Sequence, residues 1–183
     1  GDSDQWVADV LDYAANKDMI VINLLDVLGN QAREEELAPG MQGEEEDGPV
    51  YDEHVWLSLR NAIVFVKAIA EVLASMDEEH AGDYSANAAT YIEKLAALDE
   101  EYKEVIAGAK VKTLLFGDRF PFLYMVNDYG LSYFAAFAGC SAETEASFET
   151  ISFLAKKLDE LSLHCVLTID GSDQRIAEPI IQN

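Results

Sequence analysis

One continuous stretch decides the fold: residues 111–137 read VKTLLFGDRFPFLYMVNDYGLSYFAAF. The apolar run at 111–116 predicts a strand, and residues 120–127 predict a short helix. A second apolar run at 132–137 predicts another strand. Because strand, helix and strand follow one another directly, the two strands are expected to lie parallel in one sheet, with the helix in the crossover.

The same alternation continues toward the C-terminus. Residues 147–161 predict a helix, 163–169 a third strand, and 174 onward a last helix. The fold class expected for this half is therefore α/β, with a parallel sheet and flanking helices.

Upstream of residue 111 the pattern is mostly helical. Residues 55–76 are apolar nearly all round, which predicts a helix buried on several sides. Residues 84–107 carry an apolar stripe opposite charged residues, which predicts a helix about 35 Å long. A shorter helix is expected at 6–15, and a buried strand at 19–25.

Residues 34–53 differ in composition from the rest of the chain. They hold nine acidic residues and no Lys or Arg, together with Gly and Pro. Such a stretch cannot bury an apolar face, so a mobile loop is expected.

The net negative charge of the chain limits the kinds of binding partner that can be expected. The 183 residues carry a formal net charge of -23 with 12 basic residues. This argues against nucleic acid as a ligand and against docking on an anionic membrane surface. No apolar run reaches the roughly 18 residues of a membrane-spanning helix.

Several polar residues could carry chemistry. Ligands of open parallel sheets bind beyond the carboxyl ends of the strands, where Asp118 follows the first predicted strand. Cys140 and Cys165 lack CxxC spacing, so no zinc knuckle is indicated, and free thiols or a disulfide both stay open. His80 is expected in a solvated turn, and His164 in a structural position.

His54 stands at the junction between the acidic segment and the helix predicted at 55–76. A neutral imidazole is a good zinc ligand, but spacing alone also allows a structural histidine. Residues 52–58 read DEHVWLS and are followed by Asn61 and Ala62. This segment resembles the D-P-H-x-W-x-S-x-x-N-A segment of cluster A-I solute-binding proteins, which deliver zinc or manganese to ABC importers. The resemblance implies that His54 is a metal ligand.

Two further segments support the resemblance. FGDRFPFLY at 116–124, followed by DYGL at 128–131, resembles the segment where the family places a second ligand before a helix ending in Y-G-L. The resemblance implies Asp118 as that ligand. ETEAS at 143–147 is similar to the family's E-x-E-P-S. Three other acidic residues are weaker ligand candidates: Glu143, Glu145 and Asp170.

This sequence also departs from the family pattern. Glu53 stands in place of the proline of D-P-H, and the acidic segment lacks the histidines that are frequent in the family's loop. A first-lobe histidine is expected upstream of residue 1 and a last ligand downstream of residue 183. The chain is therefore expected to be truncated at both ends.

The resemblance implies two lobes joined by one long helix, with metal bound between the lobes. The expected division is a partial N-terminal lobe at 1–83, a linking helix at 84–108 and a partial C-terminal α/β lobe at 109–183. The implied function is the metal-binding component of an ABC importer, with Zn²⁺ or Mn²⁺ as ligand and the permease as partner. The implied location is extracellular or periplasmic, with a lipoprotein anchor in the full-length form and no span in the chain itself.

Two other functions remain open. A metal-free, adhesin-like interaction module on the same fold is favoured by the histidine-free loop and the missing ligands. A carboxylate-based hydrolase would use Asp118 and Glu143 as acid and base. The chain contains no nucleophile elbow, P-loop, GxGxxG or HExxH motif, so no enzyme is expected.

Overall fold

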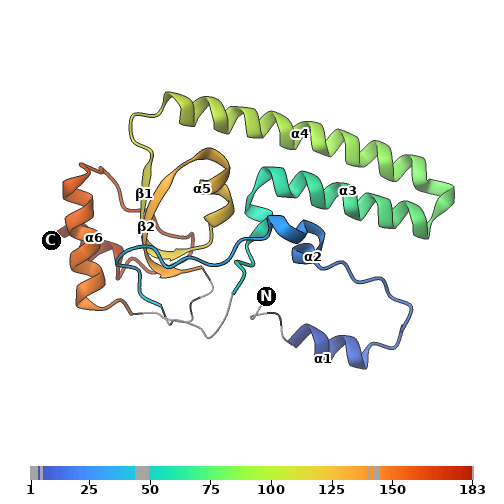
Figure 1. Ribbon diagram of the computed structural model, residues 1–183, viewed down its shortest axis with the longest axis horizontal. Coiled ribbons are helices and arrows are strands. Elements are labelled where there is room, and N and C mark those ends of the chain that lie inside the picture. The colour runs from blue at the N-terminus through green and yellow to red at the C-terminus, as the bar shows by residue number, and fades with distance from the viewer. Residues whose placement is uncertain (1–3, 5, 44–49, 140, 142–144, 183) are drawn as a thin grey trace.

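The computed structural model describes residues 4, 6–43, 50–139, 141 and 145–182. Figure 1 shows a helical part, in which two long helices lie side by side, and a second part built around two strands. No helix in the described ranges combines the length and apolar character that crossing a membrane requires.

The two long helices form an antiparallel hairpin (Figure 1). They are α3 (Leu59–Met76) and α4 (Ala81–Gly108), joined through a short 3-10 turn, η4 (Glu78–His80). Both predicted helices are confirmed, although residues 55–57 form a separate 3-10 turn, η3 (Val55–Leu57). With 28 residues, α4 is about 40 Å long.

Helix α3 is less buried than its sequence predicts. Asn61 and Phe65 are buried, but Ile69, Leu73 and Met76 are 41%, 40% and 62% exposed. Among the described elements, α4 packs along α3, while α2 (Leu24–Leu28) and η3 also contact it. The expectation of burial on several sides is therefore wrong for the second half of α3.

The sheet consists of two strands, which pair in parallel as predicted. Strand β1 (Thr113–Phe120) leads into α5 (Leu123–Tyr129), which returns the chain to β2 (Ser132–Ala138). Gly130 ends α5 with φ 64°, a left-handed conformation that glycine adopts without steric cost.

Strand β1 extends four residues beyond the predicted end at residue 116. The register of β1 against β2 shifts between Phe116 and Arg119, which marks a bulge in β1. Asp118 therefore lies within the strand, not in a loop after it.

The third predicted strand, at 163–169, is reduced to a single parallel bridge between Phe116 and Leu167. The backbone of Leu167 makes two hydrogen bonds to β1, of 2.8 and 2.9 Å. Two residues later, the N–H of Ile169 donates to the side chain of Asp118 at 2.9 Å, not to a strand backbone. The prediction of a full strand is wrong because this side-chain bond ends the ladder.

The strand predicted at 19–25 is also wrong. Met19, Ile20 and Val21 are about half exposed, and no strand pairs with them in the described part of the chain. The side chain of Asn23 accepts a hydrogen bond from the N–H of Leu25 at 3.0 Å and so caps α2. The expected N-terminal helix is present as α1 (Trp6–Tyr13).

The described parts of the acidic segment are held against the rest of the protein. Glu34 forms an antiparallel bridge with Tyr51, and Gln42 forms a parallel bridge with Phe137 of β2. Residues 34–43 are otherwise irregular, so the expected loop is present there, with its backbone paired to other segments at Glu34 and Gln42. Residues 44–49 lie outside the described part.

Apolar clusters cover the sheet on both faces. One cluster contains Leu115, Phe137, Leu154 and Ile180, contributed by the strands, α6 (Phe148–Glu160) and α7 (Ala177–Gln182). Helices α6 and α7 confirm the two predicted C-terminal helices. The second cluster joins the strands to α5 and consists of Phe116, Phe120, Val126 and Ala135.

A third cluster lies away from the sheet. It joins α5 to the helical part and consists of Leu28, Val55, Phe65 and Tyr124. The chain around His54, between Val50 and α3, thus packs against a helix of the strand-containing part.

Candidate metal centre

His54 stands at the start of η3, with its backbone fixed by local hydrogen bonds. Its N–H donates to Oδ1 of Asp52 at 2.7 Å, and its carbonyl accepts from Leu57 at 3.1 Å. An aspartate that bonds the N–H two residues ahead is a common turn former. The side chain of His54 is 18% exposed, so part of the imidazole is accessible from solvent.

The imidazole of His54 pairs with the same carboxylate. Nδ1 lies 3.2 Å from Oδ1 of Asp52, which is 1% exposed. Because a carboxylate only accepts, the bond assigns the proton to Nδ1 and leaves the lone pair on Nε2. Metal-binding histidines generally have such a partner on the other nitrogen.

The charge state of His54 follows from these neighbours. The side-chain hydrogen bond to Asp52 is the main cause that raises the pKa of His54 above 6.5. Burial acts in the opposite direction, while the negative charges of Asp52, Glu53 and Glu35 raise the pKa further. The site therefore attracts positive charge, whether a proton or a cation.

The ring of His54 lies against the end of β2. A Cβ atom on Gly139 would lie 2.9 Å from Cε1 and 3.1 Å from Nδ1 of the imidazole. It would also lie 3.0 Å from the carbonyl oxygen of Phe120, at the end of β1. Glycine at this position thus allows the imidazole to reach the carboxyl edge of the sheet.

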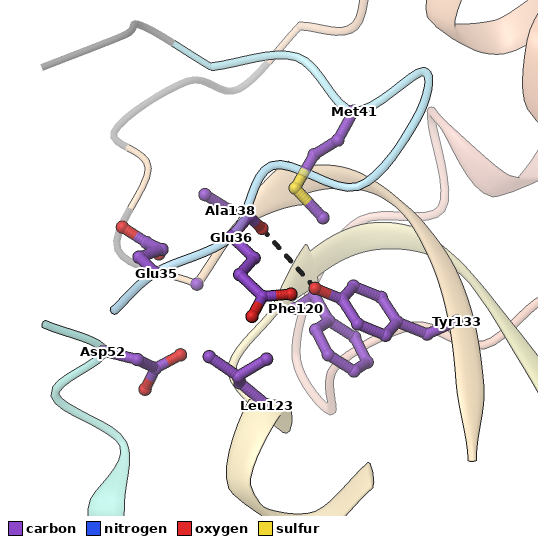
Figure 2. A pocket seen from close by; sticks show the side chains of 9 residues that line it. Glu35, Glu36, Met41, Asp52, Phe120, Leu123, Tyr133 and Ala138 are labelled. Atoms are coloured by element: carbon purple, nitrogen blue, oxygen red, sulfur yellow. Dashed lines mark hydrogen bonds between the residues drawn. The ribbon is translucent and has the colours of Figure 1, made fainter. Parts of the chain in front are cut away.

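A small pocket adjoins His54 and is shown in Figure 2. Its lining comes from the acidic segment, from β1, β2 and the residue after β2, and from α5: Glu35, Glu36, Met41, Asp52, Phe120, Leu123, Tyr133, Ala138 and Gly139. Asp52 and Gly139 both contact His54, so the ring lies at the border of this pocket.

Tyr133 contributes a neutral hydroxyl to the pocket. It donates to the backbone carbonyl of Glu36 at 3.5 Å, the dashed line in Figure 2. Burial, followed by the charges of Glu36, Asp52 and Glu35, raises the pKa of Tyr133 to about 12. The hydroxyl therefore stays protonated at neutral pH and acts as a donor.

Asp118, the other predicted ligand, is bound to backbone amides. Oδ1 accepts from the N–H of Arg119 at 2.8 Å, and Oδ2 accepts from Ile169 at 2.9 Å. The residue is 8% exposed. Each carboxylate oxygen keeps a second lone pair, so the two bonds do not exhaust its capacity to accept.

The weaker candidates do not complete a ligand set. Glu143 lies outside the described residues, and Glu145 and Asp170 are exposed. Of the two cysteines, which were not ligand candidates, Cys140 lies outside the described residues and Cys165 is exposed. Within the described ranges, no three His, Cys, Asp or Glu side chains are grouped closely enough to hold a metal ion. His164 is exposed, and His80 forms an exposed pair with Asp77 at 2.9 Å.

Two residues that contact His54, Asp52 and Gly139, were not predicted as site residues from the sequence. Asp52 carries a signal that could have identified it, because Asp-x-His spacing favours a turn in which the carboxylate meets both the N–H and the ring. Gly139 carries no comparable signal, since its role depends on contact with a residue distant along the chain.

Comparison with known proteins identifies relatives along the whole chain. A sequence profile described as zinc-uptake complex component A, periplasmic, matches residues 1–183. Zinc-binding protein AdcA of Streptococcus pyogenes is 29% identical over 185 residues, covering 96% of this chain and 36% of the relative. Zinc-binding lipoprotein AdcA of Streptococcus pneumoniae is 31% identical over 176 residues, covering 96% and 35%.

A manganese relative matches a shorter region. The manganese ABC transporter substrate-binding lipoprotein PsaA of Streptococcus pneumoniae is 30% identical over 125 residues, covering 68% of this chain and 40% of the relative. This chain thus spans about a third of the AdcA relatives, with 36% and 35% of their lengths covered.

Solved structures show the same fold. The crystal structure of ZnuA aligns with a TM-score of 0.76 at 22% identity, covering 97% of this chain and 63% of that one. AdcAII of Streptococcus pneumoniae aligns with a TM-score of 0.65 at 26% identity, covering 81% and 55%. Together with the profile match over residues 1–183, these findings show that the chain belongs to the family of the periplasmic zinc-uptake complex component A.

Proposed function

We propose that this chain binds Zn²⁺ or Mn²⁺ as cargo and passes it to the permease of an ABC importer. The observation that carries the proposal is His54, whose Nδ1 pairs with the buried Asp52, which leaves the lone pair on Nε2. Asp52 and Gly139, which both contact the ring, line an acidic pocket. The names of the relatives support it, since they include zinc-binding and manganese-transporter proteins. Binding needs no catalysis, and we assign no enzymatic activity.

We propose His54 and Asp118 as ligands from this chain. His54 would contribute Nε2, and Asp118 would contribute the free lone pairs of its carboxylate. Carboxylate oxygen is a harder ligand than imidazole nitrogen, so the pair would tolerate manganese as well as zinc. Two ligands would hold metal weakly, because zinc usually takes four.

We also propose the two-lobe division at 1–83, 84–108 and 109–183. It is supported by the course of α4, which runs from the far end of α3 back to β1 (Figure 1). In the same scheme the protein acts outside the cytoplasm, as the lipoprotein name of the pneumococcal AdcA suggests for that relative.

Isothermal titration with Zn²⁺ and Mn²⁺ near pH 7.5 tests the proposal on wild type and His54→Ala. Zinc binding that is measurable but weaker than at a four-ligand site is expected for wild type, and none is expected for the variant. His80→Ala is a matched control, because His80 also pairs with an aspartate, at 2.9 Å, but lies on the surface. Equal binding by wild type and His54→Ala would overturn the role of His54.

The role of Asp118 needs its own variant. Asp118→Asn keeps an oxygen that can accept from Arg119 or Ile169 but removes the negative charge. Weaker zinc binding is expected, together with a lower thermal midpoint of the metal-free protein, because the amide NH2 replaces one of the two acceptor oxygens. If the midpoint falls while zinc affinity stays the same, Asp118 has only a structural role.

A second candidate function is a metal-free interaction module on the same fold. It is favoured by the absence of a three-residue ligand group within the described ranges. A laminin-binding protein of Streptococcus pyogenes aligns with a TM-score of 0.63 at 22% identity, which shows only a shared fold. No binding of either metal by wild type would favour this second function.

A further inference from the structure

The hydroxyl of Tyr124, on α5, links two segments of backbone. It accepts from the N–H of Arg33 and donates to the carbonyl of Asp52, each at 3.0 Å. The N–H of Asp52 also donates to the carbonyl of Arg33 at 2.9 Å, so the three residues are joined by three hydrogen bonds. Tyr124 is 3% exposed, and burial raises the pKa of its hydroxyl, which therefore stays able to donate.

Asp128, also on α5, holds the other end of the same segment. Its Oδ2 accepts from the hydroxyl of Ser58 at 2.5 Å. Ser58 is 1% exposed and is the N-cap of α3. The guanidinium of Arg60 lies 3.7 Å from Oδ1 of Asp128 and partly neutralises its charge.

Tyr124 and Asp128 are four residues apart on α5, so they lie one turn apart on the same face of the helix. Their partners, Asp52 and Ser58, lie on either side of His54. Between them, Val55 is buried in the same cluster as Tyr124. Helix α5 therefore contacts this segment at both ends and in the middle.

We propose that Tyr124 and Asp128 are positioning residues that hold residues 52–58 so that His54 presents Nε2 to a metal ion. The inference rests on the function proposed above. Tyr124 fixes the backbone of Asp52, and the carboxylate of Asp52 orients the imidazole of His54. Since α5 connects β1 to β2, the same helix sets this segment against the sheet edge at Gly139.

Tyr124→Phe tests the proposal, with Tyr129→Phe as a matched control. Both variants remove one hydroxyl from α5, but the hydroxyl of Tyr129 donates to Asp99 at 2.9 Å, away from His54. Zinc affinity of Tyr124→Phe is expected to fall about tenfold, in the range of lost outer-shell contacts. Tyr129→Phe is expected to lose stability and keep wild-type zinc affinity.

A spectroscopic measurement on the metal-free protein separates positioning from stability. Long-range ¹H–¹⁵N correlation spectra report which ring nitrogen of His54 carries the proton. Wild type and Tyr129→Phe are expected to show Nδ1–H, and Tyr124→Phe a mixture of both tautomers. Asp128→Asn is a second variant, in which a mixture of both His54 tautomers is also expected.

The outcomes distinguish the two proposals. If wild type binds zinc and Tyr124→Phe and Asp128→Asn match it in affinity and tautomer, the positioning proposal is overturned. If wild type binds no zinc, the proposed function fails, and the tautomer spectra alone decide whether α5 orients His54.

Discussion

Gly139 and the imidazole of His54 lie in direct contact, with room for a hydrogen but not for a methyl group. A Cβ on Gly139 would lie 2.9 Å from Cε1 of the ring. The ring also contacts Asp52, with Nδ1 3.2 Å from the carboxylate. The space available to the imidazole is therefore set by the sheet edge and the acidic segment together.

The first prediction concerns Gly139→Ala. The added methyl would displace the ring of His54 or the carbonyl of Phe120, 3.0 Å away. We expect zinc affinity to fall about tenfold, comparable to the loss of an outer-shell contact. Calorimetry measures the affinity, and urea unfolding measures the accompanying change in stability.

Gly82→Ala is the control for this substitution. Gly82 lies in the first turn of α4, and a Cβ there would have nothing within 4 Å. Alanine favours a helix by about 0.5–1 kcal/mol over glycine, so stability should rise slightly while zinc affinity stays at the wild-type value. If Gly82→Ala lost zinc affinity while Gly139→Ala kept it, a clash between the methyl group and the ring of His54 could not be the explanation.

The second prediction concerns Asp52→Asn. The side-chain hydrogen bond to Asp52 is the largest cause of the raised pKa of His54, so this pKa should fall toward its ordinary value. Zinc affinity should fall about 10- to 100-fold, as for other partners of metal-binding histidines. Histidine NMR titration and calorimetry measure the two effects.

Glu53→Gln is the control for Asp52→Asn, because it also removes one negative charge. Glu53 raises the pKa of His54 through its charge, whereas Asp52 also acts through the hydrogen bond. The pKa of His54 should therefore fall less in Glu53→Gln than in Asp52→Asn. Equal shifts in the two variants would show that charge, not the bond, controls the imidazole.

The third prediction concerns pH. Zinc binds the neutral imidazole, so affinity should be full above the raised pKa of His54 and fall as the pH drops through it. The stability of the fold has the opposite pH dependence to zinc affinity. The folded state binds the proton more tightly, so the pair stabilises the fold below pH 6.5 and loses this contribution as the pH rises through the folded-state pKa.

Zinc calorimetry and urea unfolding across about pH 5–8 measure both trends, since that range brackets the ordinary histidine pKa. In Asp52→Asn the midpoint of zinc affinity should move to lower pH, together with the pKa of His54. An identical midpoint in wild type and Asp52→Asn would mean that another group controls the pH dependence.

The fourth prediction concerns the junction of α3, α4 and α5. Three groups surround the buried carboxylate of Asp99: Lys103 at 2.6 Å, Tyr129 at 2.9 Å and Arg60 at 3.7 Å. Burial alone would raise the pKa of Asp99, but the hydrogen bonds from Lys103 and Tyr129 and the nearby positive charges outweigh it and lower the pKa.

Asp99→Asn should lower the free energy of unfolding by about 1–2 kcal/mol at neutral pH, because hydrogen bonds to a charged group are lost. Since the pKa of Asp99 is lowered, its contribution is present above pH 3.8 and is lost as the pH falls through the folded-state pKa. The difference in free energy of unfolding between wild type and Asp99→Asn, measured by urea unfolding, should therefore decrease at acidic pH.

Glu100→Gln is the matched control for Asp99→Asn. Glu100 also pairs with Lys103, at 2.7 Å, but its side chain is 68% exposed. Exposed pairs contribute about 0–1 kcal/mol, so little change is expected. Equal destabilisation by the two variants would show that burial of Asp99 has no special effect.

Much of the fold could be predicted from local patterns. The helices at 59–76, 81–108 and 148–160, and the parallel pair β1–β2, lie within a few residues of their predicted positions. Helical periodicity and strand–helix–strand order are properties of short stretches, so the sequence shows them directly. The histidine of DEHVWLS was identified in the same way, from a short motif.

The errors share a physical cause. A strand needs a partner to bond its backbone, and neither 19–25 nor 163–169 finds a full ladder in the described part of the chain. The apolar residues of α3 did not show how much of the helix surface other elements would bury. An apolar run predicts the tendency to be buried, not the presence of a neighbour.

The sequence by itself determined the family pattern, the fold class and His54 as the candidate ligand. Only the tertiary structure decided the contacts of the two candidate ligands: Gly139 against the ring of His54, Tyr124 bonded to the backbone of Asp52, and the N–H of Ile169 bonded to Asp118. These contacts join residues that lie far apart along the chain. Their distances depend on how helices and strands pack, which local periodicity does not encode.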